Sequence, residues 1–420
     1  MKFFAPDWDD RVDPGYDFAT DRFSLVRHPY ESDVYAHELF RERVYDGVLV
    51  SRMALGESGP KRERVDRVGM RTYLRLPLDL ELLGDCGAFG YVAEKEPRFE
   101  TAEVIDYYHR LRFDYGVSVD HLIVTEFNDQ RNYRYEVTLR NAEDFLSVYR
   151  RGQYQFTPIG AIQGWDVFSY VEAARSVVKM GYDYFAIGGL ARSNTKTVGE
   201  IVSAVAQAVP PEVRIHIFGV ARLTLLPLFQ EFQITSVDSS APLRQAWLSA
   251  RDNYYTLDRT YAAIRIPIVD QERAKRQTIV GKSEADLATL VAAEKEALAA
   301  IRAYDRREVK LQSALTAILV YDELLAKRKF GHTSDRQRQL YLETLRDRPW
   351  KRCSCDVCRA LGVEVIIFRG NNRNRRRGFH NMRVAWQRVH GHHDLTSSSG
   401  RPTWRACDVA PRYPLPINFE

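Results

Sequence analysis

The sequence is poor in cysteine. Five cysteines among 420 residues are too few for a disulfide framework, and three of them lie together between residues 353 and 358. Small secreted domains that depend on disulfides use many paired cysteines. Cysteine usage therefore excludes that class and predicts a protein of a reducing compartment.

Long apolar runs are also missing. No stretch approaches the roughly 20 apolar residues that a membrane-spanning helix needs. The first residues, 1–18, are dense in Asp, Pro and Gly, unlike a secretory segment. We therefore expect a soluble, cytoplasmic protein with no membrane partner.

The sequence has no GxGxxG motif after a strand. This motif marks the phosphate-binding turn of dinucleotide-binding sheets, so its absence counts against that class. Hydrophobic residues make up 45% of the chain and charged residues 28%, which is ordinary for a soluble enzyme.

Strand-like apolar runs alternate with helical patterns over the first 240 residues. Strands are expected at the start of the chain and at 45–52, 82–90, 116–124, 157–164, 184–190, 213–220 and 234–240. Helices are expected at 33–45, 101–113, 141–151, 166–180, 197–209 and 223–231, and a loop at 51–67. Such alternation implies parallel strands joined by helical crossovers. We predict an α/β fold with a (β/α)₈ (TIM) barrel, and an open doubly wound sheet is the alternative.

The composition changes near residue 282. Residues 282–329 are rich in Ala, Leu, Glu and Lys, with apolar residues at helical spacing, which predicts one long helix or a helical pair. We accordingly divide the chain into a barrel (1–281), a helical segment (282–329) and a zinc-binding, nucleic-acid-contacting subdomain (330–420).

Three cysteines are clustered with one- and two-residue gaps, and a histidine follows. Zn²⁺ prefers four thiolate or imidazole ligands in a tetrahedron. The predicted ligands are Cys353, Cys355, Cys358 and His380. Four protein ligands leave no open position, so the predicted zinc is structural. The alternative is a set of unrelated buried thiols.

Acidic residues are absent between Val365 and His390, whereas seven arginines lie there. Guanidinium groups bind phosphate through paired hydrogen bonds. We predict that five of the seven contact nucleic acid: Arg369, Arg373, Arg375, Arg376 and Arg377. The alternative is a charged run that only faces solvent.

Polar or small residues stand where the predicted strands end. In a (β/α)₈ barrel, chemistry takes place at the carboxyl ends of the strands. Converging carboxylates suit a reaction at an anomeric carbon, in which one attacks and another transfers a proton. Each could instead be a turn residue or a helix cap, and metal binding is a further alternative. The candidates are Asp85, Asp120, Gln163, Gly188, Gly189 and Asp238.

The order of these motifs resembles the tRNA-guanine transglycosylases. The resemblance rests on Asp-Cys-Gly-Ala-Phe-Gly (85–90), Gly-Gly-Leu-Ala (188–191), Val-Asp-Ser (237–239) and the Cys-x-Cys-x-x-Cys cluster with His-Asn. It implies a zinc-bearing (β/α)₈ barrel that exchanges guanine for a 7-deazaguanine base in a polynucleotide.

The resemblance also implies roles for single residues. Asp238 matches the nucleophile and Asp85 the aspartate that shuttles protons. Asp120 matches the residue that reads the purine edge. Gln163 and Gly189 match further contacts to the base.

The sequence departs from the family at several positions. Cys86 replaces a serine, and Gly-Gly-Leu-Ala continues as Arg-Ser-Asn (192–194), without the usual Val-Gly-Glu. The amino-terminal segment and the arginine-rich region resemble the DpdA-type branch, whose members act on DNA. That branch implies incorporation of 7-cyano-7-deazaguanine and an ATPase partner. A tRNA-directed transglycosylase and a non-catalytic zinc protein that binds DNA remain alternatives.

Overall fold

The computed structural model describes residues 1–56, 58–269, 284–328 and 333–391. These fall into two compact units. The first comprises residues 1–9, 45–241 and the described residues from Arg388 onward, and the second comprises residues 10–44 and 242–387. The predicted tail after residue 391 lies outside the described residues.

The first unit is built on a closed barrel of parallel strands. Its strands are β1 (Lys2–Pro6), β2 (Gly47–Ser51), β3 (Glu81–Asp85), β4 (Tyr115–Val117), β5 (Thr157–Ile162), β6 (Tyr184–Ile187), β7 (Arg214–Ile217) and β8 (Ser236–Asp238). Strand β1 closes the barrel, because it pairs with β2 on one side and with β8 on the other. The predicted (β/α)₈ barrel is confirmed, and the open-sheet alternative is wrong.

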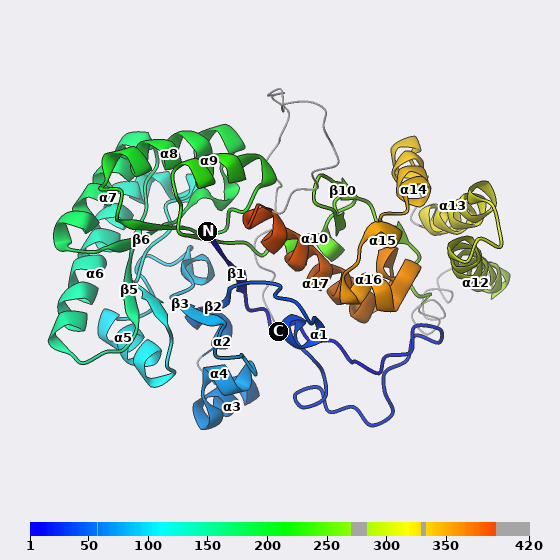
Figure 1. Ribbon diagram of the computed structural model, residues 1–420, viewed down its shortest axis with the longest axis horizontal. Helices are drawn as coiled ribbons and strands as arrows, with labels where there is room; N and C mark the ends of the chain where they lie inside the picture. The colour runs from blue at the N-terminus through cyan, green and yellow to red at the C-terminus, as the bar shows by residue number, and fades with distance from the viewer. Residues whose placement is uncertain (57, 270–283, 329–332, 392–420) are drawn as a thin grey trace. The chain divides into compact units, whose positions relative to one another are not determined.

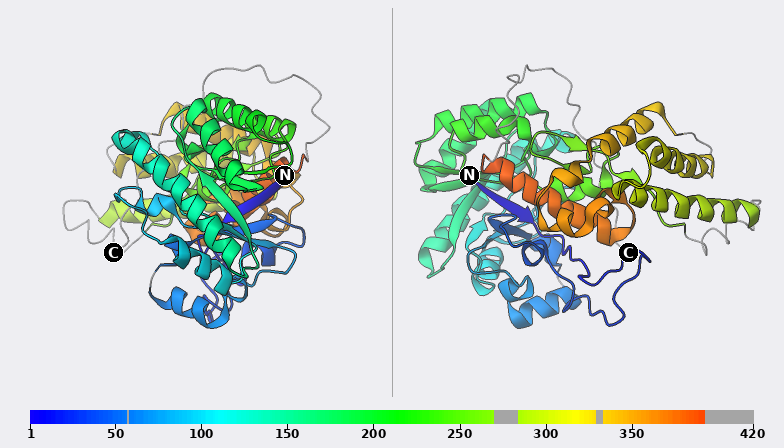
Figure 2. Two further views of the ribbon diagram at one scale, coloured as in Figure 1. Left: turned by 90° about the vertical axis from the view of Figure 1, so that its left-hand side faces the viewer. Right: turned by 45° about the vertical axis from the view of Figure 1, so that its right-hand side comes forward.

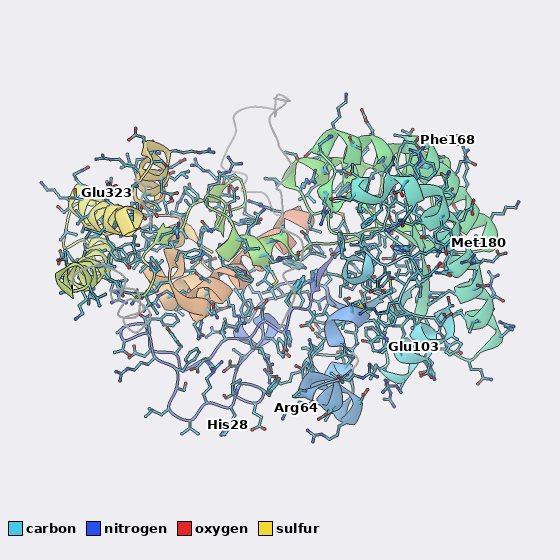
Figure 3. The ribbon with its side chains drawn as sticks, turned by 180° about the vertical axis from the view of Figure 1, so that it is seen from behind. His28, Arg64, Glu103, Phe168, Met180 and Glu323 are labelled. Carbon is cyan, nitrogen blue, oxygen red and sulfur yellow. The ribbon has the colours of Figure 1, made fainter. Side chains whose placement is uncertain are left out.

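Helices cover the outside of the strands (Figure 1 and the left view of Figure 2). The main ones are α5 (Thr101–Arg110), α6 (Arg131–Arg151), α7 (Val167–Met180), α8 (Thr195–Ala208) and α9 (Leu226–Glu231). Helix α7 illustrates their design. Asp166 caps its start by accepting a hydrogen bond from the Ser169 amide, and Gly181 ends it at a φ of 101°. Figure 3 labels Phe168 and Met180 near its two ends.

Two local expectations were wrong. Residues 51–67 are largely helical, in α2 (Arg52–Leu55) and α3 (Pro60–Val68). Only Val65 is buried in α3, so the segment lacks the apolar periodicity that signals a helix. The helix expected at 33–45 is reduced to α1 (Ala36–Leu39).

Side chains fill the interior of the barrel. The inward-facing set is Phe4, Leu49, Leu83, Val117, Ile159, Ala161, Tyr184 and Ala186. Each contributing strand ends within three residues of an inward-facing side chain. The packed interior gives the strand ends a rigid base, as in barrel enzymes generally.

The second unit is mainly helical. The predicted segment 282–329 forms a helical pair, α12 (Glu284–Asp305) and α13 (Leu311–Arg328). It is followed by α14 (Asp335–Asp347), α15 (Pro349–Arg352), α16 (Asp356–Leu361) and α17 (Gly370–Val389). Two small sheets complete it: β9 (Tyr254–Tyr255) with β10 (Thr260–Tyr261), and β11 (Ile264–Arg265) with β12 (Ile367–Phe368).

The compact units differ from the segments expected from the sequence. The last barrel strand ends at Asp238 and the first unit passes to the second after Ala241, well before residue 281. Residues 10–44 group with the second unit although they lie near the start of the chain. Within the described ranges, no helix is long and apolar enough to cross a membrane.

Candidate active site and metal centre

Asp238 stands at the carboxyl end of β8 and is held from one side. Its Oδ1 accepts a hydrogen bond from the Gly219 amide at 2.9 Å and lies 3.2 Å from His216 Nε2. Gly219 has a φ of +69°, a conformation that glycine adopts without strain. The turn after β7 therefore presents its amide directly to the carboxylate.

Asp85 stands at the end of β3 in a different environment. Burial raises its pKa to about 7, and the negative charges of Asp120 and Asp238 add to this effect. Burial disfavours a charged carboxylate, and neighbouring like charges do the same. Near neutral pH this side chain can therefore both give and take a proton.

Asp120 follows β4 and is almost completely buried. Its Oδ2 accepts a hydrogen bond from Gln163 Nε2 at 2.6 Å, and its Oδ1 accepts one from the Cys86 thiol at 3.1 Å. The pKa of Asp120 is raised by burial, and these two hydrogen bonds oppose that shift. Burial also raises the pKa of the Cys86 thiol, which stays protonated and able to donate.

Gln163 supplies an unused acceptor to the same place. It lies directly after β5, and its Oε1 is buried with no hydrogen-bond partner among the described residues. A Cβ atom at Gly189 would lie 2.8 Å from this oxygen, and one at Gly188 would clash with Gln163 Nε2. Glycine at both positions keeps the space around the amide open. A buried acceptor without a partner is costly, so it indicates a site for a ligand that donates hydrogen bonds.

The predicted strand-end residues thus form one site within the first unit. Ligand atoms of Asp85, Cys86 and Asp120 lie within 4.8 Å of one another. Gln163 contacts Asp120, and the charge of Asp238 acts on Asp85. The site combines a fixed carboxylate, a carboxyl group that titrates near neutrality and a buried set of polar atoms.

A second cluster lies in the second unit. Cys353, Cys355, Cys358 and His380 place their ligand atoms within 4.8 Å of one another. The three sulfurs lie 3.6, 3.4 and 3.5 Å from His380 Nδ1. Tetrahedral zinc, with bonds of about 2.3 Å to sulfur and about 2.1 Å to nitrogen, requires sulfur–nitrogen separations of roughly 3.6 Å. The cluster is therefore compatible with zinc.

The surroundings of His380 orient it for this geometry. Its Nε2 lies 2.8 Å from the Tyr255 carbonyl oxygen, and the Tyr254 ring stacks on it at a centroid distance of 4.1 Å. Metal-bound histidines commonly donate their second ring nitrogen in this way. The neighbouring Asn381 joins the same region, since its amide binds the carbonyl oxygens of Pro242 and Asn253.

Comparisons with known proteins agree with this geometry. The family described as queuine tRNA-ribosyltransferase matches residues 91–275. A protein of Salmonella montevideo named DNA-guanine transglycosylase is 36% identical over 409 residues, which cover 93% of this chain and 96% of that protein. The chain belongs to the tRNA-guanine transglycosylase family. It is therefore a pentosyltransferase.

The arginines of this transglycosylase contradict one prediction. Arg369, Arg373, Arg376 and Arg377 are buried, and Arg375 binds Asp10 at 2.8 Å. Their partners belong to the second unit: Arg373 binds Asp21 and Glu364, and Arg377 binds the Ala246 carbonyl oxygen at 2.6 Å. The predicted phosphate-binding surface is wrong for the four buried arginines, because their guanidinium groups are paired inside the protein. Arg375, whose side chain is 33% exposed, is already paired with Asp10.

Sequence reasoning also missed functional neighbours in this transglycosylase. His216 lies inside β7, where strand alternation would have pointed it inward, but no motif marked it. Tyr91 binds the Asp120 carbonyl oxygen at 2.8 Å and contacts the Cys86 thiol at 2.9 Å. Cys86 was noted only as a departure from the family.

Proposed function

We propose that this chain exchanges guanine in DNA for a 7-deazaguanine base by double displacement at C1′ of the deoxyribose. One observation carries the proposal. Two aspartates at the ends of β3 and β8 have different environments: Gly219 and His216 fix Asp238, whereas Asp85 titrates near neutrality. A nucleophile and an acid–base group require this difference.

In the first displacement, an Asp238 carboxylate oxygen attacks C1′ and the bond from C1′ to the guanine nitrogen breaks. A covalent ester between the aspartate and the sugar results. In the second displacement, a nitrogen of the incoming base attacks C1′ and the ester bond breaks, which regenerates the carboxylate. No oxidant or reductant is consumed.

Asp85 moves the proton in both steps. Its protonated form gives a proton to the guanine as it leaves, and the resulting carboxylate takes one from the incoming base. A pKa of about 7 keeps both forms available near neutral pH. Such matching of pKa to working pH makes a proton transfer efficient in both directions.

Asp120 and Gln163 recognise the base. Guanine and 7-deazaguanines present adjacent N–H donors along one edge, and a carboxylate accepts from both. The unpartnered Gln163 Oε1 adds an acceptor, and the Gly189 backbone approaches the base closely. A preference for the 7-cyano base follows from the DpdA-type resemblance and from the absent Val-Gly-Glu after residue 191.

We infer that Cys353, Cys355, Cys358 and His380 hold a structural Zn²⁺. The donor set and separations suit this ion, and four protein ligands leave no position for a substrate. When bound, the ion would cross-link the segment before α16, α16 itself and α17, which carry the four ligands. It would take no part in the exchange.

DNA is the proposed polynucleotide because the relative from Salmonella montevideo is named for it. A base in duplex DNA must leave the stack to reach a pocket at the strand ends, at a cost of a few kcal/mol. Assistance by an ATPase partner stays a prediction.

The test is Asp238→Asn, with Asp183→Asn as the matched control. Asp183 is exposed and pairs with Arg214, away from the strand ends that carry the site. We expect Asp238→Asn to abolish incorporation of labelled guanine into duplex DNA and the trapped protein–DNA ester, and the control to retain both. Exchange that survives Asp238→Asn would refute the nucleophile. Incorporation into tRNA but not DNA would instead favour the tRNA-directed alternative.

A further inference from the structure

A line of buried hydrogen bonds runs from the barrel interior to Asp238. Tyr184 OH lies 2.6 Å from Ser236 Oγ, and Ser236 Oγ lies 2.6 Å from His216 Nδ1. His216 Nε2 then lies 3.2 Å from Asp238 Oδ1. His216 and Ser236 are fully buried, and Tyr184 and Asp238 nearly so. The line therefore joins β6, β8 and β7 before it returns to the end of β8.

One direction of hydrogen bonding satisfies every member of the line when Asp238 is ionised. An ionised carboxylate only accepts hydrogen bonds, so the proton on the imidazole lies on Nε2. Nδ1 is then an acceptor and takes the Ser236 hydroxyl proton. The Ser236 oxygen in turn accepts from Tyr184. Each donor in the line then has an acceptor, and the imidazole N–H at Nε2 is directed at Asp238.

The two oxygens of Asp238 are consequently unequal. Oδ1 accepts from both the Gly219 amide and His216. Oδ2 accepts no hydrogen bond from any residue that the structure describes. Two donors on one oxygen fix the plane of the carboxylate and leave the other oxygen free to react.

We propose that His216 is a positioning residue that fixes Asp238 so that Oδ2 is the oxygen that attacks C1′. This inference rests on the proposed function, because it requires Asp238 to be the nucleophile. Efficient attack needs reacting atoms about 3 to 3.5 Å apart with aligned orbitals, and a misplacement of about 1 Å costs on the order of 100-fold in rate. His216 would thus raise kcat while contributing little to DNA binding.

A purely structural role is the competing explanation. The His216 ring packs against Phe218 and Phe4, with ring centroids 4.7 and 6.2 Å away. Removing the ring leaves a cavity in any case, so loss of activity alone would decide nothing. The experiment therefore needs variants that lose the ring equally but differ in which hydrogen bond they keep.

His216→Gln and His216→Asn form such a pair. A glutamine amide reaches the position of Nε2 and can donate to Asp238. An asparagine amide reaches only the position of Nδ1 and can bind Ser236. We expect His216→Asn to lower kcat for guanine exchange by about 10- to 100-fold with KM for DNA unchanged. We expect His216→Gln to recover most of that loss at a similar melting temperature.

Three results would overturn the inference. They are a wild-type kcat in His216→Asn, an equal loss of kcat in both variants, and a rise in KM at unchanged kcat. The outcome is separable from that for the proposed function. If Asp238→Asn still exchanged guanine, Asp238 would not be the nucleophile and the proposed function would fail. If Asp238→Asn were inactive but His216→Asn were fully active, only the role of His216 would be refuted.

Discussion

Two aspartates of the first unit show how one side-chain type acquires two roles. Asp238 meets an amide and an imidazole that hold one of its oxygens. Asp85 is buried and lies near the negative charges of two further carboxylates, Asp120 and Asp238. The difference lies in the neighbours that the barrel brings to each strand end, and it suits one carboxylate to attack and the other to transfer protons.

Asp85→Asn tests this electrostatic environment through stability. The pKa of Asp85 is raised from 3.8 to about 7 in the folded protein, so the folded state binds more protons than the unfolded state between these values. The contribution of Asp85 to the free energy of unfolding is therefore fully present below about pH 4 and is lost as the pH rises through about 7. We expect Asp85→Asn to melt at a higher temperature than the wild type at pH 8 and to lose exchange activity.

Melting temperatures measured from pH 4 to pH 8 check this expectation, with Asp183→Asn as the control. The gap between wild type and Asp85→Asn should widen with rising pH, whereas the control should stay parallel to the wild type. Parallel curves for all three proteins would contradict the raised pKa.

Helix α17 shows the same principle at the scale of an element. Its sequence is strongly basic, yet Arg373, Arg376 and Arg377 are buried within the second unit and meet specific acceptors. Arg377 binds the carbonyl oxygens of Ala246, Val365 and Ile367. Burial, with the charge of Arg373, lowers the pKa of Arg377 to about 9. A buried cation needs such partners, so the helix is tied in place by polar contacts.

Arg373→Ala should therefore destabilise the protein strongly. It leaves Asp21 and Glu364, both mostly buried, without their shared partner. Breaking a buried ion pair from one side costs about 3 to 5 kcal/mol. Arg375→Ala is the matched control, since that side chain is 33% exposed and such pairs contribute at most about 1 kcal/mol.

Urea denaturation of the two variants measures the difference. If Arg375→Ala lost as much free energy of unfolding as Arg373→Ala, the buried network would not be the cause. A loss of DNA affinity without a loss of stability in Arg373→Ala would restore the phosphate-binding interpretation.

The Cys353, Cys355, Cys358 and His380 cluster predicts one tightly bound zinc per chain. Structural zinc sites contribute directly to folding. We expect Cys355→Ala to lose the metal, measured by elemental analysis, and to melt at a lower temperature. Cys86→Ala serves as the control and should keep the metal. Retained zinc in Cys355→Ala would show that this cluster is not the ligand set.

At the scale of the molecule, the barrel could be predicted from the sequence, but the long-range hydrogen bonds inside the protein could not. Strand and helix periodicities are local, and most strand ends are marked by Asp, Gln or Gly. The barrel and the six candidate residues could therefore be predicted from the sequence. The partners of His216 and Arg377 could not. Ser236 and Ala246 are distant in the chain, and only the folded structure shows that they meet these side chains.

The grouping of residues 10–44 with residues 242–387 escaped prediction for the same reason. No composition change marks residue 10, and the contacts that define the second unit come from both ends of the chain. Asp21 is an example, because its carboxylate binds Arg369 and Arg373.

The closure of β1 on β8 has a consequence for biosynthesis. Lys2 pairs with Ser236 and Phe4 with Asp238, so β1 is synthesised well before β8 and lacks its second neighbour until β8 emerges from the ribosome. An unpaired strand edge can bind other chains during that time. Slowed translation or a missing chaperone should therefore reduce the yield of active enzyme before it affects the stability of molecules that have already folded.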